Sequence, residues 1–294
     1  MRNPNNILLL ICLITIVLFS TECQNHRKLP TIDSDNYIND SLAENYWNNF
    51  KFSDSTIRAV DVESSFASYA RLLYGLPYKD AIKAEFRLIK VLNESCTSVY
   101  KVFMDMAEKY FYNPQSGLCD DELYRPFLKN AVNNKKLDYA TRERLQYRLE
   151  INGRNRPGDQ AIDFIYETID GKNSSLYGIR SKYVLVYFNN PDCHDCKIVC
   201  EELKRNSQIS RLVSNNILKI LSVYPDRDKR MWIKNAKSIP VNWINAIDST
   251  GNIKDDNIYD LKAIPTLYLL DVNKRVVLKD ASFKKLINFM LHIA

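Results

Sequence analysis

The sequence predicts an all-α N-terminal domain followed by an α/β C-terminal domain. From Trp47 to about Asn152, apolar residues recur at three- and four-residue steps, and no strand-like alternation interrupts them. After the Gly- and Pro-containing stretch at 152–159, short apolar runs typical of buried strands alternate with helical segments. Strands interleaved with helices indicate a sheet with helices packed on its faces. The length of 294 residues suits about two domains.

The first residues have the pattern of an export signal. Arg2 precedes an apolar run from Ile7 to Phe19, which is 13 residues long. A membrane-spanning helix needs about 20 residues, so this run better suits the hydrophobic region of a signal peptide. "STEC" follows and ends at Cys23, a candidate lipidation site, although Glu22 differs from the small residue that bacterial lipoprotein signals have there.

We therefore assign residues 1–22 to a signal peptide or membrane anchor and residues 23–45 to a polar tether. The sequence leaves open a lipid on Cys23, a cleaved ordinary signal and an uncleaved apolar anchor. In each case we expect an exported protein, either in the periplasm or anchored to the membrane of a bacterial cell envelope.

The predicted helical domain covers residues 46–152. In its first helix Val62, Phe66 and Tyr69 lie at helical spacing, and the pattern stops at Gly75. Similar patterns predict further helices, and the aromatic and methionine residues in them are expected to form the core. These further helices lie at about 81–96, 98–112, 120–134 and 141–152.

The predicted α/β domain covers residues 153–294. Its strands are expected at 183–188, 217–224, 266–271 and 275–280, the last two joined by a tight turn. Helices are expected at 193–206, at roughly 228–236 and at 282–293.

The charge pattern argues against nucleic-acid binding. The net charge is only +6, and no Lys/Arg cluster is long enough to follow a phosphate backbone. Besides Cys12 and Cys23, five cysteines remain, which is an odd number and too few for a disulfide framework. The clustered thiols therefore need another explanation.

Three of these cysteines lie in "NNPDCHDCKIVCEELK", residues 189–204. Cys193 and Cys196 form a CxxC pair that opens a helix after a buried strand, where the helix dipole favours a thiolate. Cys196 lies one turn later and can close a short disulfide loop. Cys200 shares a helix face with Leu203, so we expect it to be a buried apolar thiol.

A metal site is the weaker interpretation of the same cluster. His194 and Cys200 should point to different sides of the helix, and the other histidines are His26 and His292. A c-type haem attachment would need a histidine where Lys197 stands. We expect no metal and no cofactor.

Residues 155–294 resemble the thioredoxin-like superfamily, above all its TlpA-type, membrane-anchored envelope branch. The resemblance runs from "RPGDQAIDF" through "DGK" and the buried strand to "DCHDC", and continues in "DLKAIPTLYLLD". It implies a thioredoxin-like fold and a thiol–disulfide oxidoreductase, with Cys193 as the attacking thiolate and Cys196 as the resolving thiol. Ile264 and Pro265 match the family's cis-proline loop, which shapes the groove for an extended substrate peptide.

The helical half resembles an uncharacterised domain that precedes thioredoxin-like domains in envelope proteins of Bacteroides-type bacteria. The residues that carry this resemblance are "AEKYFYNPQSG", "DELYRP" and "NRPGDQA". No activity comes with it. Together the two resemblances imply a protein disulfide as substrate, an envelope redox partner and association with the membrane.

The chain departs from the family pattern at several positions. Tyr187 stands where thioredoxin has a buried acid, Val199 where the TlpA-type branch often has a glutamate, and Asp192 where an aromatic residue is usual. Asn190 replaces the threonine expected in a peroxiredoxin, which argues against a peroxidase. These departures leave a second hypothesis open, that of a thioredoxin-fold binding or scaffold protein with a vestigial or structural dithiol.

Three residues around the dithiol are expected to modulate it. The helix dipole and a protonated His194 favour the thiolate, whereas Asp192 and Asp195 oppose it. A strong disulfide donor needs a strongly stabilised thiolate. We therefore predict a reductase or isomerase, with a potential nearer about −270 mV than about −120 mV.

Overall fold

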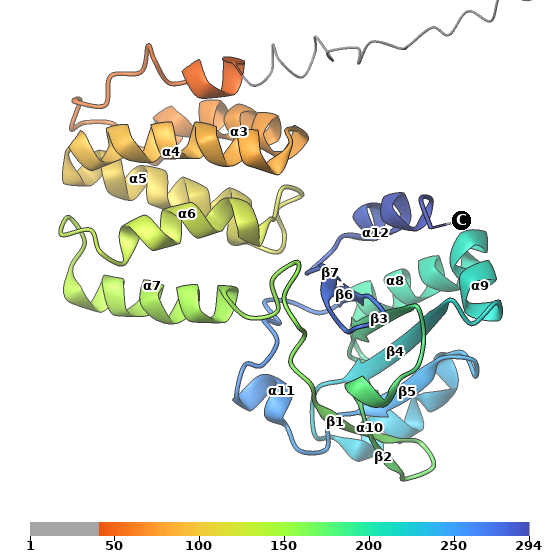
Figure 1. The fold of residues 1–294 in the computed structure, drawn as a ribbon. Coiled ribbons are helices and arrows are strands. Elements are labelled where there is room, and N and C mark those ends of the chain that lie inside the picture. The colour runs from red at the N-terminus through yellow and green to blue at the C-terminus, as the bar shows by residue number, and fades with distance from the viewer. Residues whose placement is uncertain (1–40, 294) are drawn as a thin grey trace, which may run out of the picture.

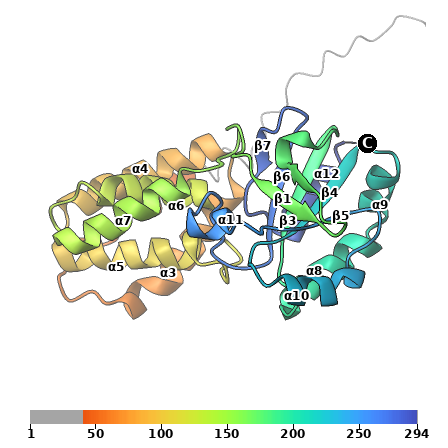
Figure 2. The same ribbon diagram turned by 90° about the horizontal axis from the view of Figure 1, so that it is seen from below.

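A computed structural model describes residues 41–293 of the chain. It has a helical N-terminal half and a mixed α/β C-terminal half, which lie side by side in an elongated molecule (Figures 1 and 2). The predicted signal segment, most of the predicted tether and the candidate lipidation site Cys23 lie outside the described residues. Within residues 41–293, no helix is both long enough and apolar enough to cross a bilayer.

The helical half is a stack of α-helices that follow one another in chain order from top to bottom of Figure 1. Side-chain caps mark two of the helix starts: Asp120 accepts a hydrogen bond from the Glu122 amide, and Asp138 accepts one from the Thr141 amide. The helices are α3 (Ala59–Gly75), α4 (Tyr78–Glu94), α5 (Thr97–Ala107), α6 (Asp121–Ala131) and α7 (Tyr139–Asn152), with a π-helical turn, Glu108–Tyr112, continuing α5.

The core of this half is aromatic, as the sequence predicted. Phe66 and Tyr69 of α3 are fully buried, and so is Phe103 of α5. The Trp47 ring packs edge-on against Phe103 with a centroid separation of 5.1 Å. Glu85 of α4 is also fully buried, and among the described residues neither of its carboxyl oxygens has a hydrogen-bond partner.

The C-terminal half is built on a seven-stranded sheet in the order β2-β1-β5-β4-β3-β6-β7. Strand β3 lies parallel to β4 and antiparallel to β6, and β4 is parallel to β5. The strands are β1 (Ile165–Thr168), β2 (Asn173–Ser175), β3 (Tyr183–Phe188), β4 (Leu218–Tyr224), β5 (Ile244–Ile247), β6 (Thr266–Leu270) and β7 (Val276–Leu278).

Helices cover this sheet, which has a hydrophobic core on each face. Successive side chains of β3 point alternately into the two cores. Val184, Val186 and Phe188 face one core, whereas Leu185 and Tyr187 face the other. The second core receives apolar side chains of α8, α9 and α12. The helices of this half are α8 (His194–Arg205), α9 (Ser207–Ser214), α10 (Lys229–Lys234), α11 (Asn252–Asp255) and α12 (Phe283–Met290), with 3-10 turns at Leu176–Gly178 and Ala236–Ser238.

The segment between the halves runs along strand β7. The Gly158 amide donates to the Val276 carbonyl at 2.8 Å, and the Val276 amide donates to the Asp159 carbonyl at 2.9 Å. A further bridge pairs Gln160 with Arg275. The connecting segment therefore lies beside the last strand of the sheet.

The halves also meet through buried charges. Asp121 of α6 pairs with Lys262 and, at 2.9 Å, with Lys279, and all three side chains are at most 6% exposed. The Lys279 ammonium also donates to the Asn152 carbonyl at 2.9 Å. A buried charge is costly unless it is paired, so these contacts fix the helical half against the sheet half.

Candidate functional site

The CxxC pair lies where strand β3 passes into helix α8. Cys193 is the N-cap residue of α8, and its Sγ accepts a hydrogen bond from the Cys196 amide at 3.2 Å. The Asn189 side chain holds the preceding loop, because its amide donates to Ser222 Oγ at 2.8 Å and to the Tyr187 carbonyl at 3.1 Å. The sulfur of Cys193 thus lies at the positive end of the helix, against an amide that would stabilise a thiolate.

The loop before strand β6 approaches this sulfur from a distant part of the chain. The Ile264–Pro265 peptide bond is cis. Cys193 Sγ lies 3.4 Å from the Ile264 carbonyl oxygen and can donate to it. The structure thus brings together the two predicted parts of the site, which are separated by 71 positions in the sequence.

The two cysteines of the pair differ in environment. Cys193 is partly exposed, whereas Cys196 is 2% exposed and its sulfur accepts from the Asn190 amide at 3.5 Å. Burial, together with the hydrogen bond to Cys193, raises the pKa of Cys196. The accessible sulfur is therefore the one at the helix start, and the second is a protected thiol.

Tyr187 packs beneath the pair from strand β3. Its hydroxyl donates to the Cys196 carbonyl at 2.6 Å, and burial raises its own pKa. At neutral pH it is a neutral phenol with its proton engaged, so it positions the first turn of α8 and does not replace the acid of thioredoxin as a proton acceptor.

The three predicted modulating residues, Asp192, His194 and Asp195, are exposed. Solvent screens their charges, so each exerts only a small effect on the dithiol.

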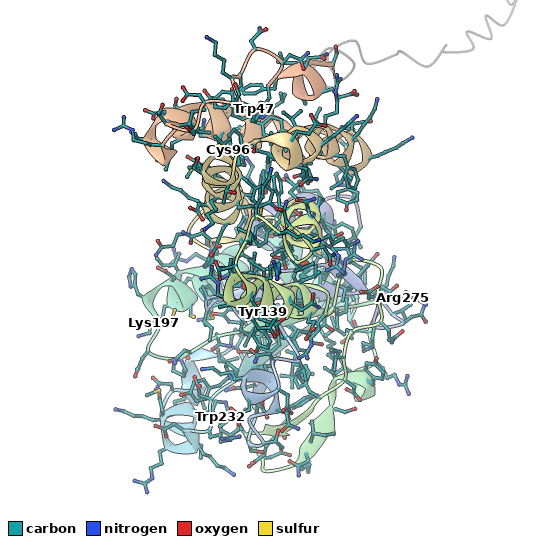
Figure 3. All side chains as sticks on the ribbon, turned by 90° about the vertical axis from the view of Figure 1, so that its left-hand side faces the viewer. Trp47, Cys96, Tyr139, Lys197, Trp232 and Arg275 are labelled. Carbon is teal, nitrogen blue, oxygen red and sulfur yellow. The ribbon has the colours of Figure 1, made fainter. Side chains whose placement is uncertain are left out.

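The third cysteine of the cluster belongs to the core. Cys200 is 6% exposed and packs with Leu203 against the sheet, and burial raises its pKa. Figure 3 shows Cys96 in the helical half, away from Lys197, which follows Cys196 directly. Within residues 41–293, no cluster of three or more Cys, His, Asp or Glu side chains could hold a metal ion.

A cleft of about 910 Å³ adjoins the dithiol and extends between the two halves. Asp195, Ile264 and Pro265 line it near the dithiol. Cys119 of the helical half also lines it, with burial raising the pKa of that thiol to about 12. The cleft was not predicted from the sequence. Part of its lining, residues 114–117 and 121–122, lies in the motifs that resemble the uncharacterised helical domain, but no activity comes with that resemblance, and these residues meet the proline loop only through folding.

A parallel-and-antiparallel sheet with a CxxC pair at the start of a helix, opposite a cis-proline, defines a thioredoxin fold. The comparisons agree: residues 181–276 match the family described as thioredoxin-like, and residues 32–155 match a domain of unknown function, DUF5106. The crystal structure of a thioredoxin-like protein from Bacteroides caccae is 34% identical, with a TM-score of 0.84, over 90% of this chain and 97% of that one. The chain belongs to this thioredoxin-like family.

Other solved structures match the C-terminal half. A C-terminal domain of an uncharacterised Bacteroides fragilis protein is 41% identical over 47% of this chain and 98% of that one, with a TM-score of 0.46. The thioredoxin domain of a thiol-disulfide oxidoreductase from Bacteroides vulgatus is 22% identical over 47% and 97%, with a TM-score of 0.41. A search of the curated proteins found no match.

Proposed function

We propose that this protein is a thiol–disulfide oxidoreductase of the cell envelope that reduces or isomerises disulfides in other proteins. The observation that carries the proposal is the position of Cys193 Sγ, which lies 3.2 Å from the Cys196 amide and 3.4 Å from the Ile264 carbonyl. The amide favours the thiolate, and the proline loop offers backbone groups to an extended substrate.

The reaction consists of two thiol–disulfide exchanges. The Cys193 thiolate attacks one sulfur of the substrate disulfide, a mixed disulfide forms, and the other substrate sulfur leaves as a thiolate. Cys196 then gives up its proton, which the released substrate thiolate accepts, and attacks the Cys193 sulfur, so that the second substrate sulfur leaves as a thiolate. The substrate gains two electrons and the protein keeps a Cys193–Cys196 disulfide, which a dithiol partner in the envelope must reduce. In isomerisation, a substrate thiolate resolves the mixed disulfide instead.

The raised pKa of Cys196 supports this division of roles. A protonated resolving thiol does not attack prematurely, so the mixed disulfide survives long enough for exchange. The exposed Asp192 and Asp195 carboxylates are screened by solvent and add only a small negative potential at the pair, in the direction of the reducing end of the redox scale.

The envelope location rests on the apolar run Ile7–Phe19 and on Cys23. We expect the protein to fractionate with membranes and a Cys23→Ala variant to be released if a lipid is the anchor. Retention of that variant in the membrane would point to the apolar segment itself.

Trapping tests the activity directly. A Cys196→Ser variant should accumulate mixed disulfides in cells through Cys193, and these can be isolated and identified by mass spectrometry. Cys200→Ser is the matched control and should trap nothing, because Cys200 is a core thiol.

Equilibration against a glutathione buffer then gives the potential, which we expect nearer about −270 mV than about −120 mV. A value at the oxidising end would contradict the reductase and isomerase assignment. If no Cys193–Cys196 disulfide forms at all, the binding or scaffold function is favoured instead.

A further inference from the structure

The cleft beside the dithiol has two walls that come from different halves of the chain. One wall is the proline loop with the segment after β7, including Ile264, Pro265 and Ala281. The opposite wall comes from the helical half, with Tyr74, Tyr78 and residues 114–117 and 119–122. Because Asp195 of the CxxC segment also lines it, the cleft is continuous with the surroundings of the dithiol. A substrate held at Cys193 therefore extends toward the helical half.

The helical wall is fixed in place. Lys262, three positions before the proline, pairs with the buried Asp121 and contacts the Tyr112 ring face at 4.9 Å. Nearer the surface, Lys285 of α12 pairs with Asp120 at 3.2 Å. These contacts join the proline loop and α12 to the start of α6, so the cleft keeps its width when it is empty. A preformed wall lowers the entropy cost of binding.

The charges in the cleft largely neutralise one another. Asp121 and Asp120 are each paired with a lysine, as described above. In addition, Arg156 forms a bidentate salt bridge with Glu122, with hydrogen bonds of 2.8 and 2.5 Å. A ligand with a large charge of either sign therefore meets little complementary charge. By contrast, Tyr74 and Tyr78 are 40% and 52% exposed and offer two aromatic faces at the helical wall. This lining suits an extended chain of low net charge that carries an apolar or aromatic side chain.

We propose that the helical domain forms the second wall of the substrate groove and binds the polypeptide segment that flanks the substrate's disulfide. Tyr74 and Tyr78 contact an apolar or aromatic side chain of that segment while its cysteine reaches Cys193. This inference rests on the proposed oxidoreductase function and assigns the helical half a role in selecting protein disulfides over small ones. Binding pockets in proteins often lie at domain interfaces and have volumes of about 300–1,000 Å³, a range that includes this cleft.

The test offers two disulfide substrates to the full-length protein. In insulin the disulfides are flanked by polypeptide, whereas dithionitrobenzoate is a small disulfide without any polypeptide. The protein is first reduced with dithiothreitol and freed of the excess, and a single turnover with each disulfide is followed. In the Tyr74→Ala/Tyr78→Ala variant we expect the second-order rate constant for insulin to fall about tenfold, as for loss of an aromatic anchor. We expect the value for dithionitrobenzoate to stay within about twofold, because that step needs only the dithiol. Tyr139→Ala is the matched control, since Tyr139 is 69% exposed in the same half and does not line the cleft.

A Tyr74→Phe/Tyr78→Phe variant, which keeps both rings, should retain the insulin activity. This would show that the loss in the alanine variant comes from the missing ring contacts. If insulin reduction is unchanged in the alanine variant, the groove proposal is overturned while the oxidoreductase function stands. Equal losses for both disulfides would also overturn it, because the cleft would then serve small disulfides or support the dithiol alone. If the unaltered protein reduces neither disulfide, the oxidoreductase function itself fails and the groove proposal fails with it.

Discussion

Replacing Lys262 by methionine should destabilise the protein strongly at neutral pH. The Lys262 side chain is 4% exposed and contacts Asp121, Asp280 at 3.4 Å and Asp260 at 3.8 Å. With Lys279, two buried ammonium groups serve these three carboxyl groups. Methionine keeps most of the side-chain volume, so the substitution removes the charge and leaves one ammonium group for three carboxyls.

The size of the effect follows from the proton that the variant must take up. Because the variant has lost one ammonium group, one more of the buried carboxyl groups has to be neutral. At pH 7 this means protonating an aspartate whose ordinary pKa is 3.8. This costs about 1.4 kcal/mol for each of roughly three pH units, or roughly 4 kcal/mol. The figure agrees with the 3–5 kcal/mol that is typical when one partner of a buried ion pair is removed. It is a large fraction of a usual protein stability of about 5–15 kcal/mol.

The loss should depend on pH. Burial opposes ionisation of Asp121, but Lys262 and Lys279 together lower its pKa, so its pairing stabilises the fold above pH 3.8 and is lost as the pH falls through the folded pKa. Burial raises the pKa of Asp260 and of Asp280, so these groups take up protons more readily as the pH falls. The difference between the variant and the unaltered protein should therefore shrink from pH 7 to pH 4.

Urea unfolding at pH 7 and pH 4, followed by tryptophan fluorescence, measures both quantities. The matched control is Lys285→Met, whose ion pair with Asp120 is partly exposed and should contribute less than about 1 kcal/mol. Adding Asp121→Asn to Lys262→Met should recover part of the loss. A cost below about 1 kcal/mol at pH 7, or one that does not shrink at pH 4, would refute the reasoning.

Three further outcomes are expected. Burial raises the pKa of Glu85 well above 4.5, so its carboxyl destabilises the fold increasingly as the pH rises. In urea unfolding, Glu85→Gln should therefore have a free energy of unfolding roughly 1–3 kcal/mol higher than the unaltered protein at pH 7, and the difference should be smaller at pH 4.5. The control substitution Glu94→Gln, at an exposed position, should change the free energy of unfolding little. Tyr187→Phe removes the side-chain donor from the Cys196 carbonyl and should lower the free energy of unfolding by about 1 kcal/mol, with no loss of thiol labelling at Cys193. Alkylation of the reduced protein near neutral pH, read by peptide mass spectrometry, should modify Cys193 well before Cys196 or Cys200. Faster labelling of Cys200 would contradict both the nucleophile assignment and the buried position of Cys200.

The sequence predicted the elements whose apolar patterns are long. Strand β3 and helix α3 each present an uninterrupted pattern, and the structure confirms both. Strands β1, β2 and β5 were not predicted, because they are only three or four residues long and partly exposed, so no apolar run or strict alternation marks them. Helix α9 was also missed, since it follows α8 after one residue.

The site was predictable only where a local motif exists. The CxxC pair and the Ile264–Pro265 loop each have a signature, and the distance between them then follows from the fold. The ion pair of Lys262 and Asp121 joins residues 141 positions apart, and both were indistinguishable from solvated surface charges in the sequence. Partners of this kind become visible only when the two halves are seen together.

The hydrogen bonds between residues 158–161 and strand β7 have a consequence for aggregation. A strand at the margin of a sheet exposes backbone groups that can pair with another molecule. Here the connecting segment occupies part of that margin, through its contacts with Val276 and Lys274. A C-terminal half produced alone would keep this protection only if it began before Gly158, and one that began at Ile165 would expose β7 and should self-associate as its concentration rises.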